Sequence, residues 1–410
     1  MPQILNALRA RAWYAWVAFL VPPVAIFGHA LAPGRAFLKG QDLGVLSALA
    51  LAAVAFAAWV PFRASGRWPR LVVATMAVML VAWLAQILVI QRDGDLFTIA
   101  TVCLPLFVVL LAVKPPSAAD IRIAGLVLAY GLAAIAVVSL VVGLLGWMPS
   151  GFEGADNGVC RTPVYCQIFG NVNRWAGPFG SVNYAAPVGA VLIVLGAAQV
   201  RRHAVPLVAA GVLIMFLSQG RSALFATIAG LVVVILSSRR VAASPQHRRI
   251  RAISLAGLAI VLVVYMTAVD PDLNGRVGYW KQFLGMWRDQ PWTGIGTSGI
   301  LDYNAAHTAD ITVSHAHSVI LDQLVRWGPV MALLTVAILV LALLGSARAL
   351  RTAGSGPLAV AVAIVVAGLV ETLYDWTYWS VAVALLLWSV MSMRTPAAAQ
   401  DEASRADAPA

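Results

Sequence analysis

Charged residues and cysteines are scarce in this 410-residue sequence. Only 11% of the residues are Asp, Glu, Lys or Arg, whereas soluble domains carry about a quarter, and 61% are hydrophobic. This balance excludes an ordinary soluble protein and indicates an integral membrane protein. Of the three cysteines, Cys103 falls in an apolar segment, whereas Cys160 and Cys166 share a polar loop. The sequence also lacks a Walker A motif and any soluble segment suited to ATP binding.

The apolar runs are continuous and lack the alternation of a membrane barrel, so they predict helices. About 20 apolar residues cross a hydrocarbon core of ~30 Å. The predicted fold class is therefore an all-α polytopic membrane protein, with one transmembrane domain over residues 1–394 and a disordered tail over 395–410. Residues 12–32 are long enough for a first span rather than a signal peptide. We expect about twelve spans: 12–32, 43–61, 71–90, 96–113, 122–147, 184–200, 204–218, 222–237, 252–269, 318–345, 357–373 and 376–393.

The distribution of charge predicts the orientation of these spans. Most of the 28 basic residues fall on the side of the membrane that holds the N-terminus, and most of the 17 acidic residues fall on the opposite side. The positive-inside rule then places both termini in the cytoplasm, where the net charge of +11 faces anionic lipid, so nucleic acid is not needed as a partner. Two long loops, 148–183 and 270–317, face outward, and we expect the working surface there.

Three outward arginines are candidates for binding an anion. Arg174 precedes the span that begins near Asn183, and a snorkelling interfacial cation is the alternative. Arg221 lies in a tight turn that starts at Ser218, where a charge held against the bundle needs a carboxylate or a phosphate. Arg276 opens a segment whose apolar residues recur at spacings of three, four and seven, which predicts a short helix. Most of that helix, including Trp280, fits an anchor in the outer interface.

Two histidines, His315 and His317, precede the span at 318–345. Ser314 is a suitable N-cap, which places His317 in the first helical turn. The positive end of a helix keeps a histidine neutral and attracts phosphate, so His317 can act as a base beside an anion. No Glu or Cys stands at a convincing ligand spacing, so a metal site is not expected.

Other polar residues leave alternatives open. Glu371 and Asp375 are turn carboxylates in an aromatic belt, or they bind sugar, or they pair with one of the arginines. Cys160 and Cys166 share a loop in an oxidising compartment and are a candidate disulfide, but spacing does not establish its geometry.

Five short motifs occur in a fixed order, and together they resemble the O-antigen ligase and O-antigen polymerase family of bacterial membrane glycosyltransferases with a GT-C-type fold. They are Arg174-x-x-Gly177-x-Phe179-x-x-x-Asn183, Ser218-x-x-Arg221-Ser222-Ala223, Arg276-x-x-x-Trp280, Pro291-x-x-Gly294-x-Gly296 and His315-x-His317-x-x-x-Leu321-x-x-x-x-x-x-Gly328. The chain departs from the family at Ser318, often Asn, and at Arg326, often acidic.

The resemblance implies an enzyme of the bacterial cytoplasmic membrane that takes a glycan from undecaprenyl pyrophosphate on the outer face. It implies that Arg174, Arg221 and Arg276 bind the pyrophosphate, and that His317, or His315 as second choice, activates an acceptor hydroxyl on a lipid, protein or glycan. No cofactor or metal is implied. A polymerase of the same family is the first alternative. A flippase for lipid-linked glycans and a non-catalytic scaffold are alternatives from other classes.

Overall fold

The computed structural model describes residues 118–145, 174–179, 181–199, 201–237, 275–306, 315–350 and 354–372. The elements within these ranges are helices, in agreement with the all-α prediction. Six predicted spans (12–32, 43–61, 71–90, 96–113, 252–269 and 376–393) lie outside the described residues, as does the tail at 395–410.

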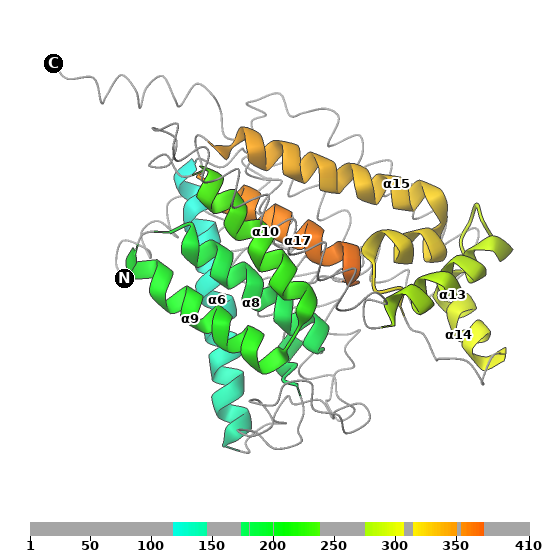
Figure 1. Ribbon diagram of the computed structural model, residues 1–410, viewed down its shortest axis with the longest axis horizontal. Helices are drawn as coiled ribbons and strands as arrows, with labels where there is room; N and C mark the ends of the chain where they lie inside the picture. The colour runs from blue at the N-terminus through cyan, green and yellow to red at the C-terminus, as the bar shows by residue number, and fades with distance from the viewer. Residues whose placement is uncertain are drawn as a thin grey trace, which may run out of the picture.

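Five helices form a bundle (Figure 1). They are α6 (Ala118–Leu144), α8 (Val182–Ala197), α9 (Arg201–Ser218), α10 (Arg221–Ser237) and α17 (Gly356–Val370). Their bounds lie within a few residues of the predicted spans. Two helical stretches of the described chain, Arg122–Val141 and Val319–Arg348, are long and apolar enough to cross a membrane, and the other bundle helices are apolar but shorter. The count of twelve spans is therefore not confirmed.

Close packing of small residues aligns the bundle helices. A Cβ atom on Gly189 of α8 would lie 2.8 Å from the carbonyl oxygen of Gly211 on α9, so glycine is needed for this helix pair to approach so closely. The helices α8 and α9 run antiparallel, as do α10 and α17 (Figure 1). The start of α8, the end of α9, the start of α10 and the end of α17 consequently gather at one end of the bundle.

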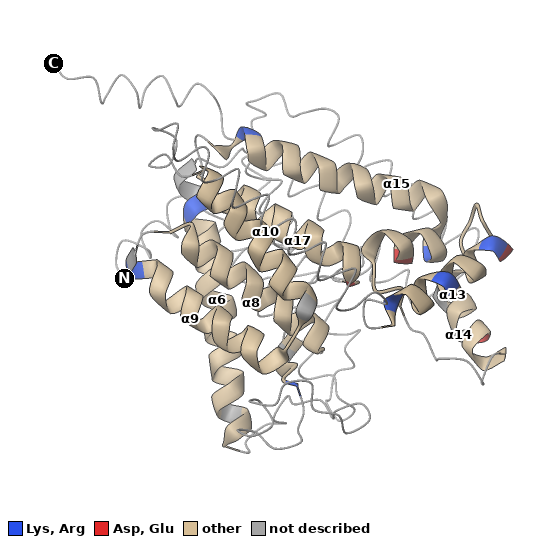
Figure 2. Cartoon of the chain, viewed as in Figure 1, with Lys and Arg blue, Asp and Glu red and all other residues tan. Residues whose placement is uncertain are grey.

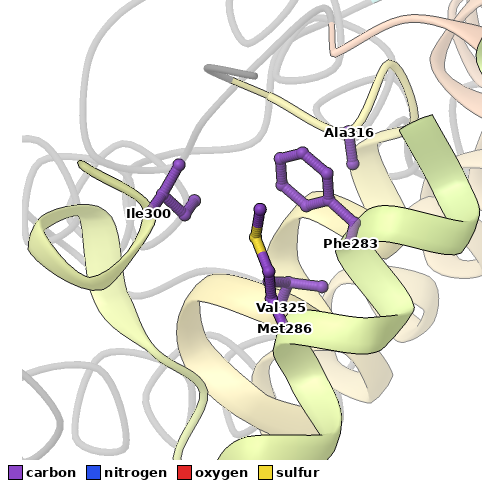
Figure 3. Close-up of a cluster of buried hydrophobic side chains, with 5 residues drawn as sticks. All are labelled: Phe283, Met286, Ile300, Ala316 and Val325. Carbon is purple, nitrogen blue, oxygen red and sulfur yellow. The ribbon is translucent and has the colours of Figure 1, made fainter. Parts of the chain in front are cut away.

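A second unit lies beside that end of the bundle. It consists of α13 (Arg276–Asp289), α14 (Gly296–Ala306) and the first turns of α15 (Val319–Arg348) (Figure 1). Five buried residues hold the three helices together, namely Phe283, Met286, Ile300, Ala316 and Val325 (Figure 3). Burying such side chains stabilises a fold by about 1.5–3 kcal/mol for each large one.

This unit confirms a predicted helix. The apolar spacing predicted the helix that is α13. Its residues Phe283 and Met286 are buried at 0% and 1% exposure, so part of its apolar face packs inside the protein. The helix α14 (Gly296–Ala306) was not predicted.

The helix α15 is not the continuous span predicted at 318–345. Gly328 interrupts it with φ 82° and ψ 178°, and Pro329 follows. Proline clashes with the preceding turn of a helix, and the backbone angles at Gly328 are accessible only to glycine. The chain therefore turns sharply there, and the part before Gly328 packs on α13 while the longer part runs along the bundle (Figure 1).

The turn that follows α13 fits against this kink. The Ile295 N–H donates to the Val325 carbonyl oxygen at 2.8 Å. A Cβ on Gly294 would lie 2.5 Å from the backbone of Arg326, and a Cβ on Gly328 would lie 2.3 Å from the carbonyl oxygen of Trp292. Both glycines thus permit the two backbones to touch, which explains their places in the sequence motifs.

We expect Gly328→Ala to destabilise the protein strongly. The methyl group adds a steric clash to a forbidden backbone conformation, at a cost on the order of 2–5 kcal/mol. Gly354→Ala is the matched control, because Gly354 also has a positive φ (83°) but no atom within 4 Å of a Cβ. Its cost is about 1 kcal/mol. Thermal melting of the purified variants in detergent measures the difference, and equal losses would contradict the proposed contact.

Candidate active site

Arg276 is the first residue of α13, directly after Gly275, whose φ is 85°. Its guanidinium group donates to Oε1 of Glu371, 95 residues further along the chain. Both side chains are largely buried, with 13% and 2% exposure. The pairing of an arginine with Glu371 was one of three alternatives that the sequence left open. In a site so poorly hydrated, the pair fixes both side chains.

Glu371 also contacts His317. It follows the last residue of α17 in an extended conformation, and its Oε2 lies 3.1 Å from Nδ1 of His317. One carboxylate therefore joins Arg276 and His317, which come from two other segments of the chain. We call these three residues the Glu371 network.

The Glu371 network determines which nitrogen of His317 holds the proton. An ionised carboxylate only accepts hydrogen bonds, so Nδ1 of His317 must donate. In the neutral ring, Nε2 then carries the lone pair. A histidine oriented in this way by a carboxylate is the arrangement of a general base.

The backbone at His317 differs from the predicted one. Ser318, not Ser314, is the N-cap of α15, and its side chain makes no capping hydrogen bond. His317 therefore precedes the helix instead of lying in its first turn, and it has a φ of 47°, in the left-handed region. Such a conformation costs a non-glycine residue about 1–2 kcal/mol. Ser314 itself lies outside the described residues.

Asp322, which the sequence interpretation missed, holds this strained segment. Its Oδ1 accepts from the backbone N–H of Ala316 at 3.0 Å, and its Oδ2 accepts from Nε of Arg326 at 2.8 Å. Asp322 is 1% exposed and Ala316 is fully buried. The i, i+4 spacing of Asp322 and Arg326 is the signal that reveals the pair in the sequence. Arg326 thereby supports the histidine segment through Asp322.

His315 lies against His317, with 4.2 Å between the ring centroids. Burial lowers the pKa of His315 below 6.5, and the neighbouring His317 lowers it further, while Asp322 and Glu371 act in the opposite direction. His315 is therefore neutral at neutral pH, in keeping with a polar contact for an uncharged hydroxyl.

The lowered pKa of His315 predicts a loss of stability in acid. Below pH 6.5 the unfolded chain binds a proton at this residue more readily than the folded protein does, so the free energy of unfolding falls as the pH falls. His315→Gln removes this contribution. The melting temperature of the variant should decline less between pH 7.5 and 5 than that of the wild type, and parallel declines would contradict this explanation.

Arg174 belongs to a segment packed on the turn between α9 and α10. The N–H of Trp175 donates to the Leu217 carbonyl oxygen at 2.9 Å, and the Trp175 ring meets Phe179 edge to face. A Cβ on Gly177, whose φ is 54°, would lie 2.4 Å from the Trp175 ring. The first sequence motif therefore places Arg174 beside the end of α9, where Leu217 precedes Arg221 by four residues.

The register of α10 and α17 relates Arg221 to the Glu371 network. A Cβ on Gly230 would lie 3.1 Å from the carbonyl oxygen of Ala359, so these two residues face each other. In an antiparallel pair, moving nine residues back from Gly230 and nine forward from Ala359 brings Arg221 level with Gly368. Gly368 lies one turn before Glu371. The side chain of Arg221 lies outside the described residues.

The remaining candidates have varied positions. Ser218 is fully buried and its Oγ donates to the Met215 carbonyl oxygen at 3.4 Å, within its own helix. Asn183 donates its backbone N–H to the Ser181 side chain, which caps α8. Trp280 lies one turn after Arg276 on α13. Asp375, Cys160 and Cys166 lie outside the described residues.

Charge is distributed unevenly over the described residues (Figure 2). The bundle helices carry charged side chains mainly near their ends, whereas α13, α14 and the start of α15 carry both signs. Within the described ranges, no group of three or more His, Cys, Asp or Glu is arranged to hold a metal ion.

Comparison with known proteins gives a match to a protein family. Residues 205–336, about a third of the chain, match the model of a family described as O-antigen ligase. No curated protein matches the chain. The matched segment contains Arg221, Arg276, His315 and His317, whereas Arg174 and Glu371 lie outside it. The match confirms the resemblance inferred from the sequence motifs.

Proposed function

We propose a function from the premise that residues 205–336 place this chain in the O-antigen ligase and polymerase family. The protein is a metal-independent inverting glycosyltransferase. It transfers a glycan from undecaprenyl pyrophosphate to an acceptor hydroxyl at the outer face of the cytoplasmic membrane. The single observation that carries the proposal is the Glu371 network, in which a carboxylate orients His317 and pairs with Arg276.

In this mechanism Nε2 of His317 takes the proton of the acceptor hydroxyl. The acceptor oxygen attacks the anomeric carbon from the side opposite the diphosphate, so a C–O bond forms as the bond to the diphosphate oxygen breaks. The departing undecaprenyl pyrophosphate carries the negative charge. Arg276, with Arg221 and Arg174 at the same end of the bundle, stabilises that charge, because a guanidinium group donates two parallel hydrogen bonds to phosphate oxygens.

The identity of the acceptor distinguishes a ligase from a polymerase within the family. A ligase transfers the glycan to a lipid or protein, and a polymerase transfers it to another glycan. We favour the ligase because the family match is described as a ligase. A flippase for the same donor needs charged or broken helices at the middle of the membrane. The described break at Gly328 instead packs against the Trp292–Gly294 turn.

The test uses purified protein in detergent, a labelled undecaprenyl-pyrophosphate oligosaccharide, a chelator, and separate lipid, protein and glycan acceptors. The proposal predicts a labelled product with inverted anomeric configuration and release of undecaprenyl pyrophosphate. The acceptor that becomes labelled separates ligase from polymerase. Movement of intact donor across liposomes, with no transfer to any acceptor, would replace the proposal with the flippase.

A further inference from the structure

Three side chains in the segments that carry the Glu371 network and the histidines have buried polar atoms that make no hydrogen bond within the described part of the protein. Gln323 is 1% exposed, and both its Oε1 and its Nε2 are without a partner there. The same holds for Oγ1 of Thr372, which is 6% exposed, and for Nε1 of Trp280. Buried polar groups are nearly always hydrogen-bonded in folded proteins, so each of these needs an explanation.

Two of the three residues neighbour members of the network in the chain or on a helix face, and the third neighbours the residue that holds the histidine segment. Thr372 follows Glu371 directly, and Trp280 lies one helical turn after Arg276, on the same face of α13. Gln323 follows Asp322, whose carboxylate holds Ala316 between the two histidines. Three unsatisfied groups thus come from the segments that carry Arg276, Glu371 and the two histidines.

Packing alone does not account for Gln323. Its neighbours at i−4 and i+4 on α15 are Val319 and Trp327, and both are 1% exposed. An apolar side chain such as methionine fills the same volume without losing the hydration of an amide. A ligand that reaches the amide and makes hydrogen bonds to both of its atoms explains why a glutamine is present.

We propose that Gln323, together with Thr372 and Trp280, binds hydroxyl groups of the first sugar of the transferred glycan. This inference rests on the proposed function. An amide donates and accepts, as does the threonine hydroxyl, and the indole N–H donates, which matches a pair of neighbouring sugar hydroxyls. The first sugar is bonded directly to the diphosphate, so groups adjoining Arg276 are the ones it meets.

The test measures binding rather than turnover. Gln323→Met keeps the length and volume of the side chain but removes both hydrogen-bonding atoms. We expect its Kd for undecaprenyl pyrophosphate carrying a short oligosaccharide to rise roughly 10-fold, which corresponds to one or two lost hydrogen bonds. Its Kd for undecaprenyl pyrophosphate without sugar should equal that of the wild type, and its melting temperature should be unchanged or higher.

Thr227→Val is the matched control. Thr227 is also a buried polar residue, but its Oγ1 already donates to the Ala223 carbonyl oxygen at 2.7 Å. This variant should melt at a lower temperature and bind both lipids normally.

Equal weakening of both lipids by Gln323→Met would overturn the assignment, since the residue would then serve the diphosphate. A lower melting temperature with unchanged binding of both lipids would also overturn it, since the role would be structural. If sugar binding depends on Gln323 but the protein transfers no glycan, this assignment is supported and the proposed catalytic function is contradicted. The two proposals therefore fail separately.

Discussion

Replacing His317 by alanine is expected to lower kcat for glycan transfer by about 10²–10⁴-fold, the usual contribution of a general base. The variant leaves the acceptor hydroxyl without a group to take its proton. KM for the donor should change little, because Arg276 still pairs with Glu371 and remains at the site. Initial rates over a range of donor concentrations measure both parameters.

His203→Ala is the matched control for this variant. His203 lies near the start of α9, at the opposite end of the bundle from Glu371, and bonds to Tyr130 at 2.9 Å. The His203→Ala variant should transfer glycan at the wild-type rate. Wild-type kcat in the His317 variant would contradict its role as base, and His315 would then become the candidate.

The second large effect is expected from Glu371→Gln, with a fall in kcat of similar size. The amide of glutamine can donate to Nδ1 of His317, which favours the tautomer with the proton on Nε2. In that tautomer Nε2 cannot accept the proton of the acceptor hydroxyl. The substitution also leaves the largely buried Arg276 without its carboxylate. Breaking such a pair costs about 3–5 kcal/mol when both groups are fully buried, and Arg276 is 13% exposed, so the lower end applies.

Asp302→Asn provides the control for the loss of a carboxylate. Asp302 is exposed on α14 and, within the described residues, makes no hydrogen bond or ion pair with Arg276, His317 or Glu371, so it serves as a carboxylate outside the Glu371 network. It should retain both activity and melting temperature. If Glu371→Gln melts at a lower temperature but keeps its kcat, the carboxylate has a structural role alone.

Local patterns in the sequence predicted much of the fold. Continuous apolar runs locate the bundle helices, and the spacing of residues such as Phe283 and Met286 predicts α13. These signals depend on residues close together in the chain. The kink in α15 was missed, because Gly328 and Pro329 stand in a run whose hydropathy fits a single span.

The candidate site was predicted in its parts but not in its connections. Arg276, His317 and Glu371 were each singled out by residue type and place, yet Glu371 is 54 residues from His317 and 95 from Arg276. Packing of α13, α15 and α17 brings them together, and chain separation does not reveal such packing. Asp322 was missed because its bond to the backbone N–H of Ala316 leaves no sequence signal, and its i, i+4 spacing to Arg326 was not used.

The central claim is that Glu371 acts through His317. A double-mutant cycle on kcat with His317→Ala, Glu371→Gln and the combined variant tests it most directly. Groups that act as one unit are not additive. We predict that kcat of the combined variant is at most a few-fold lower than kcat of His317→Ala. Losses that multiply, so that the combined variant is slower by the product of the two single effects, would contradict the claim.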